Sequence, residues 1–178
     1  MKELSLSQEI DLHIDRVQDF PKEGIQYKDI SPIFLNADLC TKIVKAFADL
    51  SRGKIDAVCG IESRGYLFGV QIARELGLPF ILVRKAGKLP PPIISQEYDL
   101  EYGSAIIEVK KGHIKPGQRI LIHDDVLATG GTASACAKLV QNCDAVVSQF
   151  SFILGLSFLG GLDELKKYTQ DIELLVEY

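Results

Sequence analysis

The sequence predicts an α/β protein with a doubly wound, mostly parallel central sheet and flanking helices. Short, nearly continuous apolar segments alternate with segments of helical periodicity along the 178-residue chain. Strands that are apolar on both sides are typical of parallel sheets buried between two layers of helices. Because ligands of such sheets bind beyond the carboxyl ends of the strands, we expect a functional site in the loops that follow them.

The expected elements follow one another along the chain. Helices are expected over residues 5–19, 41–50, 65–76 and 132–141, and strands over residues 55–59, 80–83, 119–122, 145–154 and 172–176. The first helix is indicated by apolar residues at helical spacing, and Phe20-Pro21 ends it because proline disfavours a helical conformation of the preceding residue. Gly77 closes the third helix, since glycine readily adopts the left-handed conformation of a helix end.

One segment breaks this alternation. Residues 85–103 contain three consecutive prolines, Pro90, Pro91 and Pro92, and show no clear periodicity. A long irregular segment in a compact protein is usually functional or mobile, so we expect a mobile loop over about residues 90–104. The length of the chain indicates a single domain over residues 1–178.

Composition and charge argue against several classes of protein. Hydrophobic residues make up 47% and charged residues 25%, as in ordinary globular proteins, and the formal net charge is -4. This acidic balance is not typical of nucleic-acid binding, and no segment is long and apolar enough to span a membrane. The four cysteines form no C-x-x-C pair, and the first residues carry no secretory apolar core. We therefore expect a cytoplasmic protein without nucleic-acid or membrane partners.

The most informative segment runs from Arg119 to Val140 and reads RILIHDDVLATGGTASACAKLV. A buried strand ends in two carboxylates, Asp124 and Asp125, and a glycine-containing turn and a helix follow. Leu127 precedes the turn, which is made of Ala128, Thr129, Gly130, Gly131 and Thr132. Converging backbone N–H groups and the positive end of the helix bind an anion, and the threonine hydroxyls add donors. Ionised carboxylates accept hydrogen bonds from sugar hydroxyls, so the segment predicts a ribose 5-phosphate site.

Other interpretations of this segment are less favoured. Two adjacent aspartates at the end of a strand are by themselves more often part of a turn or a helix cap. The combination of strand, carboxylates, glycines and helix is rarer and favours a ligand site. It is not a dinucleotide-binding fingerprint, because it contains no G-x-G-x-x-G, and it is not a Walker A loop, because no G-K-[ST] follows.

The sequence HDDVLATGGT resembles the phosphoribosyl pyrophosphate motif of the type I phosphoribosyltransferases. Three further segments resemble the adenine-specific family: FPKEGIQYKDISPIF at 20–34, GIESRGYLFG at 60–69 and VRKAGKLPPPIISQEYDLEYGS at 83–104. The similarity extends over about residues 20–161. It implies the type I phosphoribosyltransferase fold, with a small N-terminal hood over residues 1–35 and a core over residues 36–178.

The resemblance also implies which residues bind the substrates. Pyrophosphate would be bound by Ser63, Arg64, Arg84, Lys85 and Lys88, and adenine by Gln26, Tyr27, Lys28 and Leu159. The residue types suit these ligands, because arginine can bind two phosphate oxygens at once and an aromatic face is a platform for a purine. Without the resemblance, the charge cluster would be interpreted as a solvated surface, and Tyr27 and Leu159 as core residues.

The catalytic residues that the resemblance implies are Glu101 and Tyr102 on the mobile loop, together with Arg64. Glu101 would lie near the imidazole edge of the purine as the candidate for proton transfer, and Tyr102 would lie beside the reacting centre. The resemblance further implies a cis peptide between Glu62 and Ser63. Taken alone, a glutamate and a tyrosine in a loop are ordinary solvent-exposed residues.

Together these motifs imply an enzyme of purine salvage, which transfers the phosphoribosyl group of phosphoribosyl pyrophosphate to adenine and gives AMP and pyrophosphate. The implied cofactor is Mg²⁺, held mainly by substrate and water and not by direct protein ligands. A basic residue of the segment 84–88 is expected to reach the neighbouring subunit's site, which implies a homodimer. Two residues depart from the family pattern: His123 replaces an aliphatic residue, and Lys28 a frequent arginine.

Three alternatives stay open at the level of the sequence. A related enzyme could use guanine, hypoxanthine or xanthine; a regulator could bind phosphoribosyl pyrophosphate without catalysis; and a doubly wound domain could bind another phosphate. Regulators of that kind usually carry a DNA-binding domain, for which the residues before Phe20 leave no room. Formation of AMP from adenine, phosphoribosyl pyrophosphate and Mg²⁺ would separate all of these.

Overall fold

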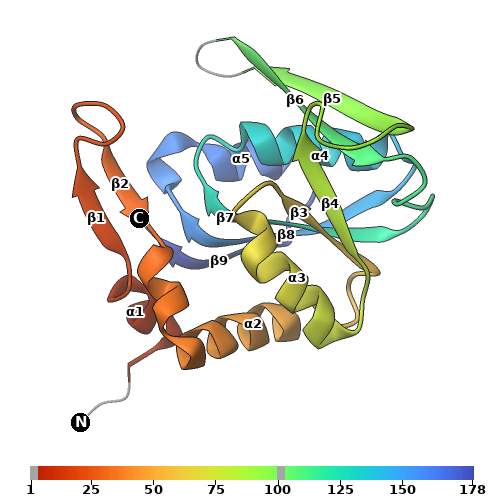
Figure 1. Ribbon diagram of the computed structural model, residues 1–178. Coiled ribbons are helices and arrows are strands. Elements are labelled where there is room, and N and C mark those ends of the chain that lie inside the picture. The colour runs from red at the N-terminus through yellow and green to blue at the C-terminus, as the bar shows by residue number, and fades with distance from the viewer. Residues whose placement is uncertain (1–3, 100–102) are drawn as a thin grey trace.

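The computed structural model describes residues 4–99 and 103–178 and has a layered α/β architecture (Figure 1). Within these residues, a seven-stranded sheet has the strand order β5-β6-β4-β3-β7-β8-β9. The strands are β3 (Ala57–Ile61), β4 (Phe80–Lys85), β5 (Ile93–Asp99), β6 (Ser104–Lys110), β7 (Arg119–Leu127), β8 (Val146–Gly155) and β9 (Ile172–Glu177). Strands β4, β3, β7, β8 and β9 are parallel, and β5 and β6 add an antiparallel hairpin at the β4 edge. The expected doubly wound, mostly parallel sheet is confirmed.

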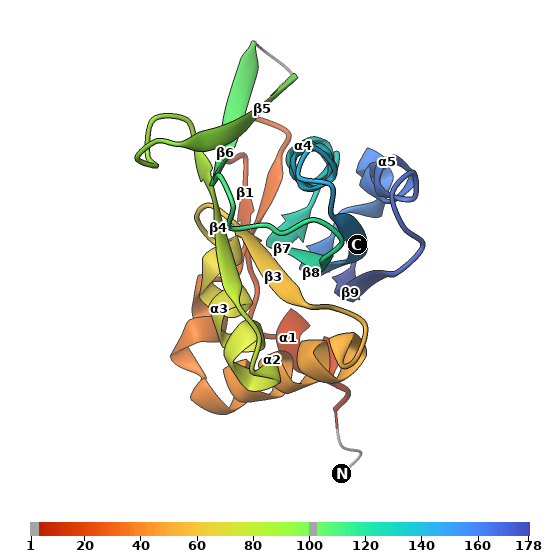
Figure 2. The same cartoon turned by 90° about the vertical axis from the view of Figure 1, so that its right-hand side faces the viewer.

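Helices cover both faces of this sheet (Figure 2). On one face lie α1 (Leu6–Asp11), α2 (Ala37–Ser51) and α3 (Gly65–Leu76), and on the other α4 (Gly131–Gln141) and the short α5 (Gly161–Leu165). Strand β3 is buried along its whole length because its side chains enter two cores. Val58 packs in the core under α2 and α3, whereas Cys59 packs in the core under α4. A strand with both faces buried is apolar throughout, which is why the sequence identifies it.

The hood contains a small hairpin that stands apart from the main sheet (Figure 1). Strand β1 (Asp15–Gln18) pairs antiparallel with β2 (Gln26–Asp29), and a short 3-10 helix, Ser31–Leu35, follows. The expected helix over residues 5–19 is therefore wrong in its second half. Its start is sound, because Ser5 and Gln8 form a capping box. The second half of the segment is a strand because residues 15–18 pair with residues 26–29. Helical spacing within residues 5–19 does not reveal this pairing.

The proline-containing segment is also more regular than expected. Residues 93–99 form β5, which pairs with β6 along its whole length, with Ile93 opposite Lys110 and Asp99 opposite Ser104. The expectation of an irregular loop over residues 85–103 is therefore wrong for this strand. The ammonium of Lys110 donates hydrogen bonds to the carbonyls of Pro90 and Pro91, at 2.6 and 3.0 Å. These bonds hold the proline segment against the hairpin.

Candidate active site

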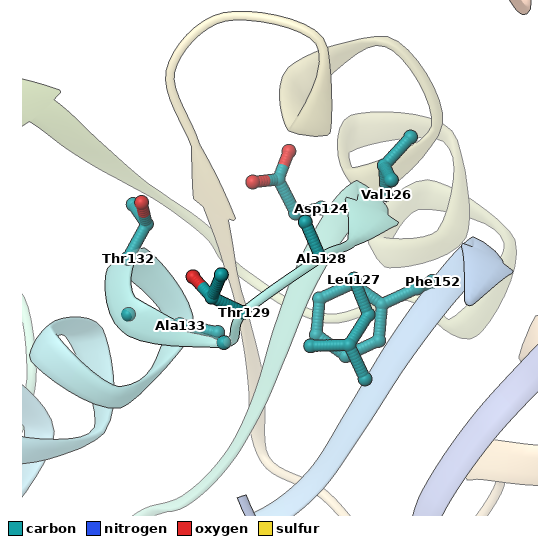
Figure 3. Close-up of a pocket in the computed structure, with 10 residues that line it drawn as sticks. Asp124, Val126, Leu127, Ala128, Thr129, Thr132, Ala133 and Phe152 are labelled. Carbon is teal, nitrogen blue, oxygen red and sulfur yellow. The ribbon is translucent and has the colours of Figure 1, made fainter. Parts of the chain in front are cut away.

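The carboxyl end of β7 and the start of α4 enclose a cavity of about 90 Å³ (Figure 3). It is lined by Asp124, Val126, Leu127, Ala128, Thr129, Gly130, Gly131, Thr132, Ala133 and Phe152. The Asp124 carboxylate and the hydroxyls of Thr129 and Thr132 lie on the same side of this phosphate loop, residues 128–132 (Figure 3). Gly130 has a φ of 81°, a conformation that favours glycine, and α4 begins at the next residue. The structure thus brings together every residue that the sequence predicts for the phosphate.

Two carboxylates lie within β7, and not after it as expected, because the strand continues to Leu127. Asp125 is buried, with 4% of its surface exposed, and its backbone N–H donates a hydrogen bond to Asp124 Oδ1 at 2.9 Å. Burial, and then the adjacent charge of Asp125, raises the pKa of Asp124 well above its ordinary value. Donors from a bound ligand would relieve this unfavourable pairing of two carboxylates.

A second loop, residues 62–65, follows β3 and faces the carboxylates. The Arg64 guanidinium donates from Nε to Asp125 Oδ2 at 2.5 Å, and from Nη1 to the Tyr27 hydroxyl at 2.6 Å. The peptide between Glu62 and Ser63 is cis, as the resemblance implies. Gly65 allows α3 to begin against β7, since a Cβ on Gly65 would lie 2.7 Å from the carbonyl oxygen of His123. Two loops that are distant in sequence therefore meet at one edge of the sheet.

The basic segment is held by one carboxylate. Glu62 accepts hydrogen bonds from the Arg84 guanidinium at 3.2 and 3.3 Å, from the Lys88 ammonium at 3.1 Å and from the Lys85 N–H at 3.0 Å. These contacts, the Arg84 bond above all, lower the pKa of Glu62 to about 2. A cavity of about 240 Å³ beside it is lined by Glu62, Ser63, Arg64, Lys85, Asp124 and Asp125. Of the three predicted cations, Lys85 lines this cavity, whereas Arg84 and Lys88 are paired with Glu62.

A third and more apolar cavity of about 300 Å³ opens toward the hood. It is lined by Ile25, Gln26, Tyr27, Lys28, Arg64, Asp124, Asp125, Val126, Ala128 and Leu156. Three of the four residues predicted for adenine are therefore together. The fourth, Leu159, lies in the 3-10 turn Ser157–Leu159 with 40% of its surface exposed and is not part of the lining. Leu156, which sequence reasoning missed, directly follows β8, and its place after a parallel strand was the available signal.

Two predicted catalytic residues, Glu101 and Tyr102, lie outside the described residues 4–99 and 103–178. The described part of the hairpin nevertheless reaches the site. The Thr132 hydroxyl lies 3.4 Å from the Tyr98 hydroxyl, which connects β5 to the phosphate loop. The described part of the β5–β6 hairpin is thus attached beside the phosphate cavity.

Two residues near the site have a supporting role. His123 is fully buried, its Nδ1 lies 2.8 Å from the Ser151 hydroxyl, and its ring packs edge-on against Phe47. Burial lowers the pKa of His123 to about 3, so it is neutral and belongs to the core. Gly161 was missed by sequence reasoning: a Cβ there would lie 2.3 Å from the carbonyl oxygen of Ala128, so glycine lets α5 support the phosphate loop.

A family model, described as the phosphoribosyl transferase domain, matches residues 26–175. This span contains the phosphate loop, the loop over residues 62–65 and nearly all of the sheet. The fold and the site therefore define a protein of the type I phosphoribosyltransferase class.

More specific relatives agree with this class. An adenine phosphoribosyltransferase of Christiangramia forsetii is 46% identical over 171 residues, 96% of this chain and 99% of the relative. A crystal structure of adenine phosphoribosyltransferase from Thermoanaerobacter pseudethanolicus is 41% identical with a TM-score of 0.91, covering 97% of this chain and 99% of the other. The Saccharomyces cerevisiae enzyme, in complex with adenine and an imino-altritol bisphosphate, has a TM-score of 0.89 at 39% identity, covering 96% and 98%. The chain belongs to the adenine phosphoribosyltransferase family.

Every helix within residues 4–99 and 103–178 is too short or too polar to cross a membrane.

Proposed function

We propose that this protein transfers the phosphoribosyl group of phosphoribosyl pyrophosphate to adenine, giving AMP and pyrophosphate in purine salvage. One observation carries the proposal: Asp124 lines all three cavities of the site. These are the cavity at the phosphate loop, the cavity beside Arg64 and Lys85, and the more apolar cavity toward the hood, here called the purine-side cavity. When the ribose of phosphoribosyl pyrophosphate lies at Asp124 and Asp125, its 5-phosphate and its pyrophosphate face two different walls of the site. The incoming adenine faces the third wall. This three-way arrangement fits a displacement at one carbon of the sugar.

The residues divide the reaction between them. The phosphate loop would bind the 5-phosphate through backbone N–H groups, and the carboxylates of Asp124 and Asp125 would accept hydrogen bonds from the ribose hydroxyls. Arg64 and Lys85 would stabilise the negative charge that develops as the bond from the ribose carbon to pyrophosphate breaks. A ring nitrogen of adenine then forms the new bond to that carbon, and the proton on the purine leaves.

Glu101 is the residue that we propose to accept this proton, with Tyr102 beside the reacting centre. Both follow β5, whose Tyr98 lies next to the phosphate loop. Closure of this segment over the site would exclude water, which competes with adenine for the sugar carbon.

Mg²⁺ fits this site as an ion held mainly by substrate and water. In the part of the chain that the structure describes, no group of three or more His, Cys, Asp or Glu is arranged to hold a metal. Asp124 and Asp125 supply carboxylate oxygens beside the ribose, which suit the hydration shell that Mg²⁺ retains. When bound, the ion neutralises charge on the leaving pyrophosphate.

The test is AMP synthesis by the purified protein from adenine and phosphoribosyl pyrophosphate, with and without Mg²⁺. We expect Mg²⁺-dependent AMP formation and a strong preference for adenine in competition with hypoxanthine or guanine. Equal use of hypoxanthine would contradict the base assignment. Binding of phosphoribosyl pyrophosphate without any AMP would instead indicate a regulator.

We also propose a homodimer, supported by an exposed apolar surface beside the basic segment. Leu67 and Val70 on α3, Leu82 on β4 and Ile106 on β6 are each between 39% and 48% exposed. The side chains of Leu82 and Ile106 lie on the α3 side of the sheet, because the neighbouring Ile81, Val83 and Ile107 point into the α4 core. A second copy seated here would bring its own basic segment 84–88 close to this site. Val70→Glu should give a monomer in analytical ultracentrifugation, whereas Val146→Glu, on an exposed strand position elsewhere, should not.

A cytoplasmic location is proposed with this function. The buried thiols of Cys59, Cys136 and Cys143 are unpaired and suit a reducing compartment.

A further inference from the structure

The hood is attached to the core partly through Tyr178, which follows β9 and lies beside the hood hairpin (Figure 1). The Tyr178 hydroxyl donates a hydrogen bond to the Asp11 carboxylate at the end of α1. Tyr178 lines a groove with Asp11, Leu12 and Val176, and it is not part of the lining of the purine-side cavity. Any influence on the purine must therefore pass through another residue.

That residue is Lys28. Its ammonium lies 4.1 Å from the centroid of the Tyr178 ring, well inside the range of a cation–π interaction. The same ammonium donates a hydrogen bond to Gln26 Oε1 at 2.7 Å. Lys28 and Gln26 both line the purine-side cavity. The Tyr178 ring thus fixes a cation that in turn fixes a side chain of the purine wall.

A second cation, Arg16, also lies over the Tyr178 ring and provides a comparison for the Lys28 contact. The Arg16 guanidinium lies 5.8 Å from the centroid of the same ring, and it also pairs with Asp11 at 2.6 Å. Arg16 is on β1, which contributes no residue to the lining of the purine-side cavity in the part of the chain that the structure describes. Both cations connect the hood to Tyr178, but one of them continues to the purine wall.

We propose that Tyr178 is a positioning residue for purine binding, acting through the Lys28 ammonium on Gln26 and on the edge of β2. The proposal rests on the proposed function, since it assumes that the purine occupies the cavity beside β2. In this proposal the Lys28 side chain positions Gln26, whereas a contact of adenine with the Lys28 backbone alone would leave the side chain without a role. An arginine at this position would bind the ring differently, because its guanidinium is planar whereas ammonium is compact.

The experiment is a set of variants assayed for both substrates. Tyr178→Leu should raise KM for adenine about three- to tenfold, the size of one partly buried cation–π contact, with KM for phosphoribosyl pyrophosphate and kcat nearly unchanged. Tyr178→Phe keeps the ring and should retain the wild-type KM for adenine. Arg16→Met is the matched control and should leave both KM values unchanged.

A double-mutant cycle tests the route through Lys28. If Tyr178 acts through that ammonium, Tyr178→Leu should add nothing to KM for adenine in a Lys28→Met background. Additive effects, equal changes in both KM values, or a lower melting temperature with unchanged KM values would each overturn the inference. These outcomes require a wild-type protein that forms AMP; a wild-type protein that forms none contradicts the proposed function, and the inference with it.

Discussion

The loops after β7 and β3 lie at the ends of adjacent parallel strands, yet they are prepared for an anion in different ways. Among the described residues, the cavity at the phosphate loop is lined by no cation, and its donors are backbone N–H groups and hydroxyls. The loop after β3 is instead held by ion pairs, Arg64 with Asp125 and Arg84 with Glu62. An anion at the backbone N–H groups of the phosphate loop would break no ion pair, whereas pyrophosphate at the second loop would compete with Asp125 for Arg64. We therefore propose that the first loop fixes the sugar phosphate and that the second exchanges partners during the reaction.

The largest effect is expected from Gly161→Ala, which disturbs the phosphate loop. The new Cβ would lie 2.3 Å from the Ala128 carbonyl oxygen and 3.1 Å from the Gly130 nitrogen, so the phosphate loop must move. A displacement of this kind costs roughly a hundredfold in rate, and we expect such a fall in kcat/KM for phosphoribosyl pyrophosphate. Gly160→Ala is the control: that glycine has a positive φ but open space around it, so it should lose stability and keep its kinetics. Equal kinetics of the two variants would contradict the role of Gly161.

A smaller effect is expected from Asp125→Asn, which breaks the ion pair in the second loop. The change keeps the shape of the side chain but removes the charge that holds Arg64 at 2.5 Å and that we propose accepts hydrogen bonds from the ribose hydroxyls. A charge-assisted hydrogen bond contributes about 1.5–3 kcal/mol, so kcat/KM for phosphoribosyl pyrophosphate should fall at least about tenfold. Asp56→Asn removes a more exposed carboxylate–arginine pair, with Arg119 at 2.7 Å and away from the cavities, and should leave kcat/KM unchanged. Wild-type kinetics of Asp125→Asn would reduce the carboxylate to a structural residue.

The smallest effect concerns Glu62 and acid stability. Its pKa is lowered from 4.5 to about 2, so the folded protein keeps this carboxylate ionised where the unfolded chain protonates it. Stability from Glu62 is therefore fully present above pH about 4.5 and is lost as the pH falls toward about 2. Glu62→Gln should flatten the dependence of melting temperature on pH in this window. Glu75→Gln, on the exposed surface of α3, should retain the wild-type slope, and a wild-type slope in Glu62→Gln would show that the Arg84 pair does not stabilise the fold.

The fold was predictable from the sequence for most strands in which burial left a local pattern, although β6 was missed despite its buried Ile107 and Val109. Strands β3, β4, β7, β8 and β9 are apolar along much of their length because helices cover both sides of them. Strands β1 and β2 could not be found in this way, because all of their residues are exposed or half-buried. The same holds for β5, whose pairing with β6 decides its conformation more than its own composition does.

The site was predictable where several of its residues are consecutive in the sequence. Asp124 and residues 126–132 form one wall because the motif is a single strand and turn. The contacts that join the walls could not be read from the sequence. The bond from Arg64 to Tyr27 spans 37 positions, and the contact of Gly161 with Ala128 depends on how α5 packs. Leu156 replaces the expected Leu159 in the cavity lining because the chain turns into the 3-10 helix directly after β8.

A crystal structure of the protein with AMP and pyrophosphate tests the division between the two loops most directly. We predict the AMP phosphate on the backbone N–H groups of the phosphate loop, the ribose hydroxyls on Asp124 and Asp125, and pyrophosphate at Ser63, Arg64 and Lys85. We also predict that Arg64 turns toward pyrophosphate and that its bond to Asp125 is lengthened or lost. A structure with the AMP phosphate on the Arg64 loop, or with pyrophosphate on the phosphate loop, would contradict this division.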